Sequence, residues 1–296
     1  MSTDWQSKLS PAIAPKVARC QEILQSMGRV VISFSGGVDS TLLLALAVDA
    51  LPTDHVLAAT GLSPSLPRRE LDDARSLAKQ LKADLVEIPT GEMNDPRYTA
   101  NPAQRCYYCK MDLFGRMRSV AKARGFDAIV TGANADDTGD FRPGLQAGRE
   151  AGVRNPLMEA GLTKAEIREI SRCLGLPTAD KPAMACLASR IPYGQPITMD
   201  NLRRIEQAEE FLKGLGLEQC RVRAHDALAR IEIPPNRFEA FLTGKASVVE
   251  RFKTLGFTYV TLDMQGLRTG SMNEVLPSQT RAAGSQKSIK GADLGG

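Results

Sequence analysis

The sequence predicts an α/β protein in which a doubly wound parallel sheet is followed by a smaller α+β domain. Short β-branched runs alternate with longer helical patterns along the first part of the chain, as strands and crossover helices do. A glycine-rich turn directly follows the first of these runs. The composition changes after Pro196, which predicts domains at residues 1–195 and 196–277. Residues 278–296 contain almost no apolar bulk and are predicted to be disordered.

The elements of the larger domain can be assigned in chain order. A helix is expected within residues 1–28, and a later helix begins at Thr163, whose capping box with Glu166 marks its start, and ends near Gly175. Residues 132–160 are rich in glycine and are predicted as a functional or mobile loop. The predicted strands are Val30–Phe34, His55–Thr60, Asp84–Pro89 and Asp127–Thr131. Three helices are predicted between them: one that begins near Thr41, one at Arg68–Lys82 and one at Lys110–Arg124.

The smaller domain is predicted from the same periodicities. Amphipathic spacing indicates a helix at Thr198–Leu215 and a second at Ala240–Leu255. Short apolar runs indicate strands at Cys220–Ala224, Ala229–Ile233 and Phe257–Leu262.

Composition excludes several classes of protein. A net charge of +4 over 296 residues is too mild for a chain that coats nucleic acid, so no nucleic-acid partner is expected. The longest apolar run, Thr41–Val48, is far below the roughly 18 residues that span a bilayer. The polar N-terminus lacks the apolar segment of a secretory signal. We therefore expect a cytoplasmic protein, in which cysteines serve metal binding or catalysis before disulfides.

The hexapeptide Ser35-Gly36-Gly37-Val38-Asp39-Ser40 is the first strong motif. Two glycines allow a close approach of backbone to ligand, and amides at a helix N-terminus attract anions. It is not a Walker P-loop, because no lysine precedes the serine. The hexapeptide resembles the PP-loop of N-type ATP pyrophosphatases, which implies an adenine nucleotide alpha hydrolase-like fold that binds ATP and Mg²⁺. Asp39 is then a candidate catalytic organiser of Mg²⁺ or pyrophosphate, although an acid in a first helical turn is also favoured by the helix dipole.

Two further segments are candidates for ATP binding. Thr131–Asp137 follows the fourth predicted strand and should emerge where ligands bind in open α/β sheets. It resembles the second nucleotide motif of the same superfamily, which makes Gly132 and Asp137 candidates, although glycine and aspartate are also common in solvated turns. Adenine is expected near the strand end at Ala58–Gly61, with Gly61 as the candidate contact.

The six cysteines divide into two groups. Cys106 and Cys109 form a CxxC just before a predicted helix, and Cys186 lies much further along. A CxxC is compatible with half of a zinc site, a redox pair or part of an iron–sulfur site, and Cys186 could instead give up its own sulfur. The remaining cysteines lie in amphipathic elements and are expected to act as small core residues. These are Cys20, Cys173 and Cys220.

Longer stretches point to one family. The stretches SGGVDS, RCYYCK, KPAMACLASRIPYG, RVRAHDALARIEI and GLRTGSMNE resemble the LarE family of ATP-dependent pyridinium-3,5-biscarboxylic acid mononucleotide sulfurtransferases. The resemblance covers roughly residues 15–275 and implies a role in making the nickel-pincer nucleotide cofactor. ATP adenylates a pyridinium carboxylate, and a sulfur nucleophile then displaces AMP, once for each carboxylate. The family's members are oligomers, so a homo-oligomer is expected.

The resemblance also implies roles for the cysteines. In one branch of the family the cysteine that matches Cys186 is sacrificed and becomes dehydroalanine. In another branch three cysteines hold a [4Fe–4S] cluster that carries the transferable sulfide. Because Cys106, Cys109 and Cys186 are all present, the cluster branch is predicted, with sacrifice of Cys186 as the alternative.

Other polar residues are candidates for holding the substrate. Arg221 and Arg223 should share one face of a strand and could bind the nucleotide phosphate, although an arginine pair is more often a solvated edge. Ser189 and Arg190 adjoin Cys186 and are candidate catalytic residues that orient the substrate or its adenylate. A tyrosine of the CxxC, Tyr107 or Tyr108, could stack on a pyridinium ring or simply pack.

Three other functions compete with this one. A PP-loop tRNA thiolase would favour a more basic surface or an RNA-binding module, and an ammonia-using PP-loop ligase would not need the three cysteines. A nucleotide-binding regulatory protein could have kept the loop and lost catalysis, although the intact Ser35, Asp39 and Ser40 argue against it.

Overall fold

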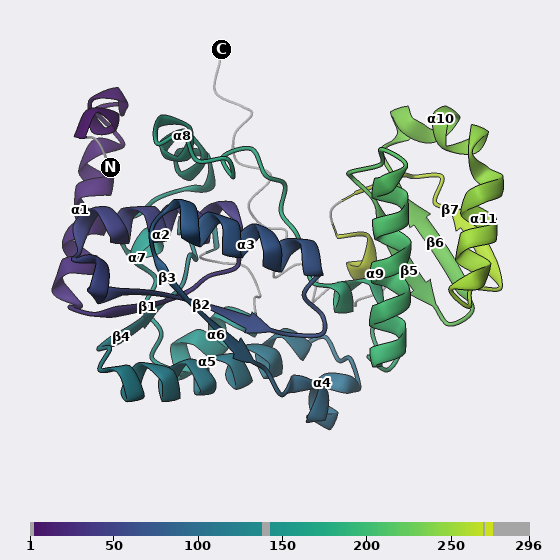
Figure 1. Cartoon of the computed structure of the whole chain (residues 1–296), viewed down its shortest axis with the longest axis horizontal. Coiled ribbons are helices and arrows are strands. Elements are labelled where there is room, and N and C mark those ends of the chain that lie inside the picture. Colours follow the sequence, from purple (N-terminus) through teal and green to yellow (C-terminus); the bar gives the residue numbers. More distant parts are fainter. Residues whose placement is uncertain (1–2, 138–142, 269, 275–296) are drawn as a thin grey trace, which may run out of the picture.

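A computed structural model of the chain describes residues 3–137, 143–268 and 270–274, and Figure 1 shows their arrangement. The tail predicted at residues 278–296 lies outside these ranges. No helix in the described ranges combines the length and the apolar character that crossing a membrane requires.

The larger part of the molecule is built on a parallel sheet of four strands in the order β3-β2-β1-β4, which confirms the predicted fold class. The central strand β1 pairs with β2 on one side and with β4 on the other, so that Val30 lies opposite both Val56 and Ala128. The strands are β1 (Val30–Ser33), β2 (Val56–Leu62), β3 (Asp84–Pro89) and β4 (Ala128–Val130).

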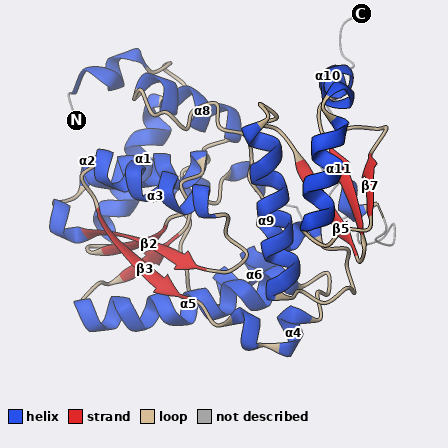
Figure 2. Ribbon diagram, turned by 45° about the vertical axis from the view of Figure 1, so that its right-hand side comes forward, coloured by secondary structure: helices blue, strands red, loops and turns tan. Residues whose placement is uncertain are grey.

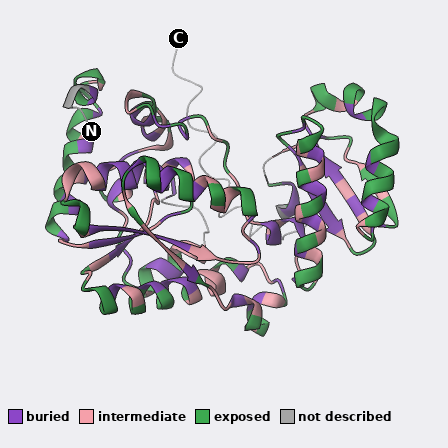
Figure 3. Ribbon diagram, in the orientation of Figure 1, coloured by how far each residue is buried: buried purple, intermediate pink, exposed green. Residues whose placement is uncertain are grey.

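Helices cover both faces of this sheet, because successive side chains of a strand point to opposite sides. Val30 and Ile32 of β1 join one apolar core, and Val31 joins the other. Figures 1 and 2 show the helices on either side, and Figure 3 shows that the strands between them are mostly buried. One layer contains α1 (Ala14–Ser26), α2 (Val38–Ala50), α3 (Arg68–Gln80) and α8 (Lys164–Cys173), and the other contains α5 (Arg105–Arg124) and α6 (Pro143–Glu150).

Two helices begin earlier than predicted. α2 begins at Val38, not near Thr41, because Gly37 is its N-cap. α5 begins at Arg105, not at Lys110, so the CxxC lies within the helix and not before it. No glycine or proline lies between Pro102 and Lys110, so nothing in the CxxC segment prevents the helix from beginning before it.

Residues 132–160 are also more regular than predicted. They contain α6 and the short helix α7 (Pro156–Glu159), and each begins at a proline, whose fixed φ suits a first helical turn. The capping box at Thr163 is confirmed: the backbone N–H of Glu166 donates to Thr163 Oγ1, and the Thr163 N–H donates to Glu166 Oε2 at 2.8 Å.

A second sheet of three strands lies in the C-terminal part, in the order β5-β6-β7. β5 and β6 are antiparallel, while β6 and β7 are parallel. The helix predicted at Ala240–Leu255 is two helices, because the chain turns at Gly244. The elements are β5 (Arg221–His225), β6 (Leu228–Glu232), β7 (Tyr259–Leu262), α9 (Met199–Gly214), α10 (Phe238–Thr243) and α11 (Lys245–Thr254).

The two parts meet around the segment that carries Cys186. Leu187, Ala188 and Ile191 are buried in the same apolar core as the second sheet, together with Tyr98 of the short helix α4 (Pro96–Thr99). The backbone that follows Cys186 is therefore held by packing against the C-terminal part.

Candidate active site

A cavity of about 440 Å³ opens at the carboxyl ends of β1 and β2, where open α/β sheets bind their ligands. Gly61 at the end of β2 lines it, as do the glycine loop and all three cysteines singled out in the sequence. Segments far apart in the chain therefore contribute to one site. The predicted site residues on its wall are Ser35, Gly37, Val38, Asp39, Gly61, Cys106, Cys109 and Cys186.

The glycine loop is shaped to receive an anion. Gly36 has a φ of +68°, and a Cβ there would stand 3.3 Å from the backbone of Ala74, so only glycine suits the position. Gly37 caps α2, which leaves the first amides of the helix available. Ser40 Oγ lies 3.2 Å from both the Ser35 hydroxyl and the Gly37 carbonyl. These contacts fix the loop before any ligand binds.

Asp39 is held by two partners. Lys164 Nζ lies 2.6 Å from Asp39 Oδ2, and Asn134 Nδ2 donates to Oδ1 at 3.3 Å. Lys164 also lines the cavity, and the sequence reasoning missed it. One signal was present: a cation in the first turn of a helix is unfavourable to the helix dipole, so Lys164 directly after the N-cap Thr163 invites a functional explanation.

Gly132 and Asp137 lie next to the glycine loop and not in the cavity wall. Among the residues described, neither lines the cavity. A Cβ on Gly132 would stand 2.9 Å from the backbone of Asp39 and Ser40. Asp137 is buried and accepts from the Asn134 N–H at 2.9 Å. Both residues thus shape the segment that presents Asn134 to Asp39.

The three candidate sulfur residues converge on the cavity. Cys106 and Cys109 lie one turn apart on α5, hence on one side of the helix, and Cys186 directly precedes the short 3₁₀ turn Leu187–Arg190. All three are free cysteines. Of the other cysteines, Cys20 and Cys220 are buried as expected, whereas Cys173 is half-buried.

The thiols of Cys106 and Cys109 are held in their protonated form by burial. Burial raises the pKa of Cys109 to about 12 against the effect of Lys110. Burial also raises the pKa of Cys106, with a further rise from Cys186 and an opposing effect of Arg105. Within the described ranges, no three His, Cys, Asp or Glu side chains are grouped so that they could hold a metal ion.

Arg190 contacts the Cys186 backbone and does not belong to the cavity wall. Its side chain is fully buried, and Nη1 donates to the carbonyls of Ala185 at 2.6 Å and Cys186 at 3.1 Å. Ser189 donates to the same Cys186 carbonyl at 2.7 Å. These two residues therefore hold the turn that carries Cys186.

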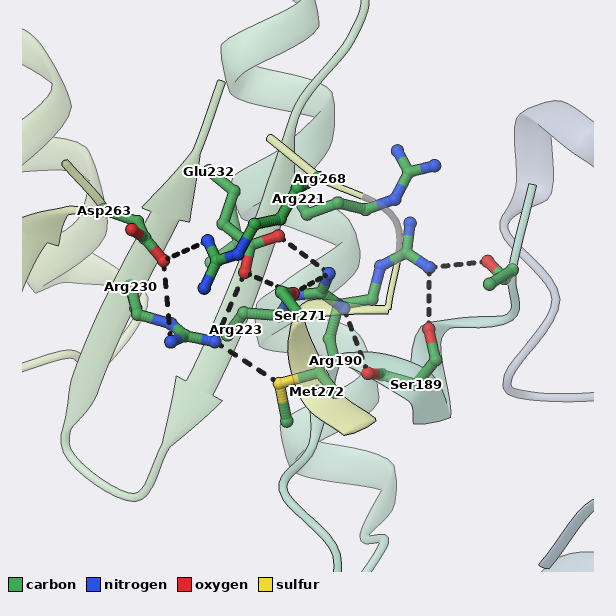
Figure 4. Close-up of polar contacts among 12 residues, drawn as sticks. Ser189, Arg190, Arg221, Arg223, Arg230, Glu232, Asp263, Arg268, Ser271 and Met272 are labelled. Carbon is green, nitrogen blue, oxygen red and sulfur yellow. Dashed lines mark hydrogen bonds and ion pairs between the residues drawn. The ribbon is translucent and has the colours of Figure 1, made fainter. Parts of the chain in front are cut away.

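Arg221 and Arg223 differ in their surroundings (Figure 4). Arg223 Nη2 donates to Glu232 at 2.7 Å and to Ser271 at 3.0 Å, and its Nη1 donates to the Ser189 carbonyl at 3.1 Å. Arg221 makes no ion pair with a described residue, and its guanidinium donates to the carbonyls of Cys220 and Ala183 and to the Met184 sulfur. Burial, followed by Arg190, lowers the pKa of Arg221, so Arg221 is the guanidinium that lacks a counter-charge.

Lys181 is a second residue that the sequence reasoning missed. It lines the cavity, and its Nζ lies 2.9 Å from both Glu70 and Asp73 of α3 and 3.5 Å from the Gly36 carbonyl. It therefore joins the Cys186-bearing segment to the glycine loop. Its sequence neighbourhood, KPAMACLASR, had already been singled out.

The tyrosines of the CxxC lie elsewhere. The Tyr107 hydroxyl bonds Glu150, and the Tyr108 ring lies under Arg97, 4.9 Å from centroid to guanidinium carbon. In the described part of the chain neither ring lines the cavity, whereas Tyr98 does.

A strand, a glycine loop and a helix N-terminus around such a cavity define a PP-loop nucleotide-binding protein, and comparisons with known proteins agree. A model of the family described as NAD synthase matches residues 16–189. An uncharacterized protein of Synechocystis sp. is 44% identical over 88% of this chain and 98% of its own length. The pyridinium-3,5-bisthiocarboxylic acid mononucleotide synthase of Lactiplantibacillus plantarum is 38% identical over 89% of this chain and 96% of its own length. A tRNA-specific 2-thiouridylase of Frankia alni is 30% identical over 52% of this chain and 53% of its own length.

The chain therefore belongs to the NAD synthase family of PP-loop proteins and, within it, to the LarE family that its motifs resemble.

Proposed function

We propose that this protein is an ATP-dependent sulfurtransferase that converts the carboxylates of pyridinium-3,5-biscarboxylic acid mononucleotide to thiocarboxylates for nickel-pincer nucleotide biosynthesis. The observation that carries the proposal is one cavity lined by both a PP-loop and three free cysteines. The L. plantarum synthase, similar over almost its whole length, supports the choice of substrate. The coverage of the tRNA thiouridylase is only about half, which favours a small nucleotide over RNA.

In this proposal residues 1–195 carry out the adenylation and supply the sulfur. The loop amides and the hydroxyls of Ser35 and Ser40 bind the ATP phosphates. Asp39, a carboxylate of the cavity wall in the first turn of α2, is suited to the accompanying Mg²⁺. Lys164 and Lys181 add positive charge on the same wall. Adenylation turns a carboxylate oxygen into part of a good leaving group, AMP, and the protein's contribution is positioning and charge neutralisation.

Residues 196–277 are proposed to hold the substrate phosphate. Arg221 is the better candidate, because it lacks an acidic partner in the described residues and contacts the Ala183 carbonyl next to the cavity. Arg223 would contribute by charge while Glu232 and Ser271 hold its orientation.

The three cysteines fit a [4Fe–4S] cluster by their chemistry and their common cavity. Each would bind a different iron atom, so these ligands need not converge on one point as they would around a single ion. When bound, the cluster would supply an iron that carries the transferable sulfide. Arg190 and Ser189 would position Cys186 through its backbone. We propose that the protein acts in the cytoplasm, where thiols stay reduced. We also propose that it acts as a homo-oligomer.

The direct test is an ATP–pyrophosphate exchange assay, run in parallel with the biscarboxylate nucleotide and with unmodified tRNA. We expect exchange and thiocarboxylate formation with the nucleotide alone. Exchange stimulated by tRNA and not by the nucleotide would contradict the proposal and would favour a tRNA thiolase.

A further inference from the structure

Four polar side chains form a largely buried group at the cavity wall that the roles above do not use. Ser63 and Ser65 follow β2, Glu92 lies in a short 3₁₀ turn, and Tyr98 lies in α4. Ser63, Ser65 and Tyr98 line the cavity, and Glu92 is 1% exposed behind them. We call these four residues the hydroxyl cluster.

The hydrogen bonds of the cluster run in one direction. Ser63 Oγ donates to Glu92 Oε1 at 2.5 Å, which uses its only proton. Ser63 Oγ therefore acts as an acceptor toward its other neighbours, the Ser65 N–H at 3.0 Å and the Ser65 hydroxyl at 2.7 Å. The protons of both serines therefore point toward Glu92, and neither serine hydroxyl is left as a donor.

Within the described part of the chain, Tyr98 carries the hydroxyl of the cluster whose proton has no acceptor. Its side chain is 2% exposed, and its hydroxyl has no hydrogen-bond partner of normal geometry among the described residues, although Ser65 lies close enough to influence it. A buried hydroxyl without a partner is costly, and Tyr98 is one of the residues that line the cavity. Burial holds the pKa of Tyr98 far above its usual value, so the hydroxyl keeps its proton and can only gain by donating it to an acceptor.

The cluster lies beside the sulfur residues. The Leu187 N–H, next to Cys186, donates to the Ser65 carbonyl at 2.8 Å, and Tyr98 lines the same cavity as Cys109 and Cys186. A substrate oxygen that accepts a hydrogen bond from Tyr98 would therefore lie close to the carbon atom that sulfur attacks. In the reaction proposed above, that acceptor is the acyl oxygen of the adenylated carboxyl group.

We propose that Tyr98, positioned by the neighbouring Ser65, donates a hydrogen bond to the acyl oxygen of the pyridinium acyl adenylate while sulfur adds to its carbon. The inference rests on the proposed function and names the residue that stabilises its second step. The sulfur lone pair forms the C–S bond, and the electron pair of the C=O bond moves to oxygen. That pair then re-forms the C=O bond and expels AMP with the electrons of the C–O bond.

No oxidant or reductant is needed in this step. Hydrosulfide as nucleophile gives thiocarboxylate, AMP and one proton, and the Cys186 thiolate gives a thioester and AMP. Both versions place the transient negative charge on the same oxygen, so Tyr98 would serve either sulfur source. A donor preorganised toward such an oxygen in a site shielded from water is worth more during addition than before it.

The test is Tyr98→Phe, which removes the hydroxyl and keeps the packed ring. In single turnover with ATP and the biscarboxylate nucleotide, we expect thiocarboxylate formation to slow by about 10²-fold, the usual loss for one such donor. Pyrophosphate release, which precedes sulfur addition, should stay within a few-fold of wild type. Tyr259→Phe, at a tyrosine that is 63% exposed on β7, is the matched control and should alter neither rate.

Different results overturn different statements. Equal thiocarboxylate rates for wild type and Tyr98→Phe would overturn the assignment, as would an equal loss of pyrophosphate release and sulfur transfer, which indicates a purely structural role. Should Tyr98→Phe fail to fold, Ser65→Ala takes its place, with a roughly tenfold slower sulfur step expected and an unchanged rate counting against the cluster. A wild-type protein that forms no adenylate with the nucleotide would refute the proposed function, and the inference with it.

Discussion

Arg190 and Glu209 form a two-point ion pair in the interior, with Nε to Oε1 and Nη2 to Oε2 distances of 2.9 and 3.0 Å. The Arg190 side chain is 0% exposed and that of Glu209 is 3% exposed. Because the remaining terminal nitrogen of Arg190 holds the carbonyls of Ala185 and Cys186, the ion pair anchors the sulfur residue to helix α9. Glu209 also accepts from the Val222 N–H at 3.0 Å, which joins β5 to the same anchor.

Arg190→Met should lower the free energy of unfolding by about 3–5 kcal/mol, because it leaves the buried Glu209 carboxylate without a counter-charge. Urea denaturation measures the change. The double variant Arg190→Met with Glu209→Leu should recover much of the loss, since an apolar pair is often as stable as a buried ion pair. A single variant as stable as wild type would show that the pair is not the anchor.

Gly132→Ala should weaken both stability and ATP binding. Its Cβ would stand 2.9 Å from the backbone of Asp39 and Ser40, and backbone cannot move aside cheaply, so a cost of about 1–3 kcal/mol is expected. Thermal unfolding and the KM for ATP are the measurements. Gly115→Ala in α5 is the control, because nothing lies within 4 Å of its Cβ; there alanine should be neutral or stabilising. Identical effects of the two substitutions would refute the packing argument.

Lys164→Met should raise the KM for ATP by about tenfold, the effect of losing one charge-assisted hydrogen bond near 1.5 kcal/mol. The Lys164 ammonium lies in the cavity wall beside Asp39, where it can turn to a phosphate. Lys79→Met, at an exposed position near the end of α3, supplies the comparison for loss of one surface charge. Equal KM values for the two variants would place Lys164 outside the ATP site.

Anaerobically purified protein should be brown and hold about four iron atoms per chain, the content of a [4Fe–4S] cluster. Cys106→Ala, Cys109→Ala and Cys186→Ala should each lose most of the iron, while Cys173→Ala keeps it. Iron analysis and visible absorption provide the readout. A colourless protein that still completes a single turnover would favour sacrifice of Cys186, which mass spectrometry would detect as loss of H₂S.

Cys186→Ala should abolish sulfur transfer and spare pyrophosphate release, because the glycine loop lies on a different segment of the cavity wall. The two products can be followed in the same reaction. Normal sulfur transfer by this variant would remove Cys186 from the mechanism.

Stability should depend on pH through Glu166. Burial works to raise the pKa of this carboxyl, but hydrogen bonds from Lys16 and Thr163 outweigh it and lower the pKa below 4.5. An acid with a lowered pKa contributes stability above its ordinary pKa and loses it as pH falls through the folded value. Glu166→Gln should therefore cost about 1 kcal/mol at neutral pH, and the gap to wild type should close below pH 4.5. Glu169→Gln, exposed on α8, should show no such closure in urea titrations.

Local patterns in the chain were sufficient for much of the architecture. The β-branched runs gave the four parallel strands within a residue or two, and Thr163 with Glu166 gave a helix start that the structure confirms. The SGGVDS loop predicted an anion site on chemical grounds alone, because glycine freedom and a helix N-terminus act within a few residues. The three cysteines that line the cavity were also separated from the others by their place in the sequence.

Contacts between distant segments could not be predicted from the sequence and are seen only in the folded structure. The spacing of Arg190 and Glu209 carries no local signal, so the buried pair between them could not be anticipated, and Arg190 looked like a residue that meets substrate. Lys164, Lys181 and Tyr98 reach the cavity from three separate segments, and nothing in their neighbours shows where they point. A side chain's role at a site depends on what packs against it, and packing between segments more than a hundred residues apart is set by the whole fold.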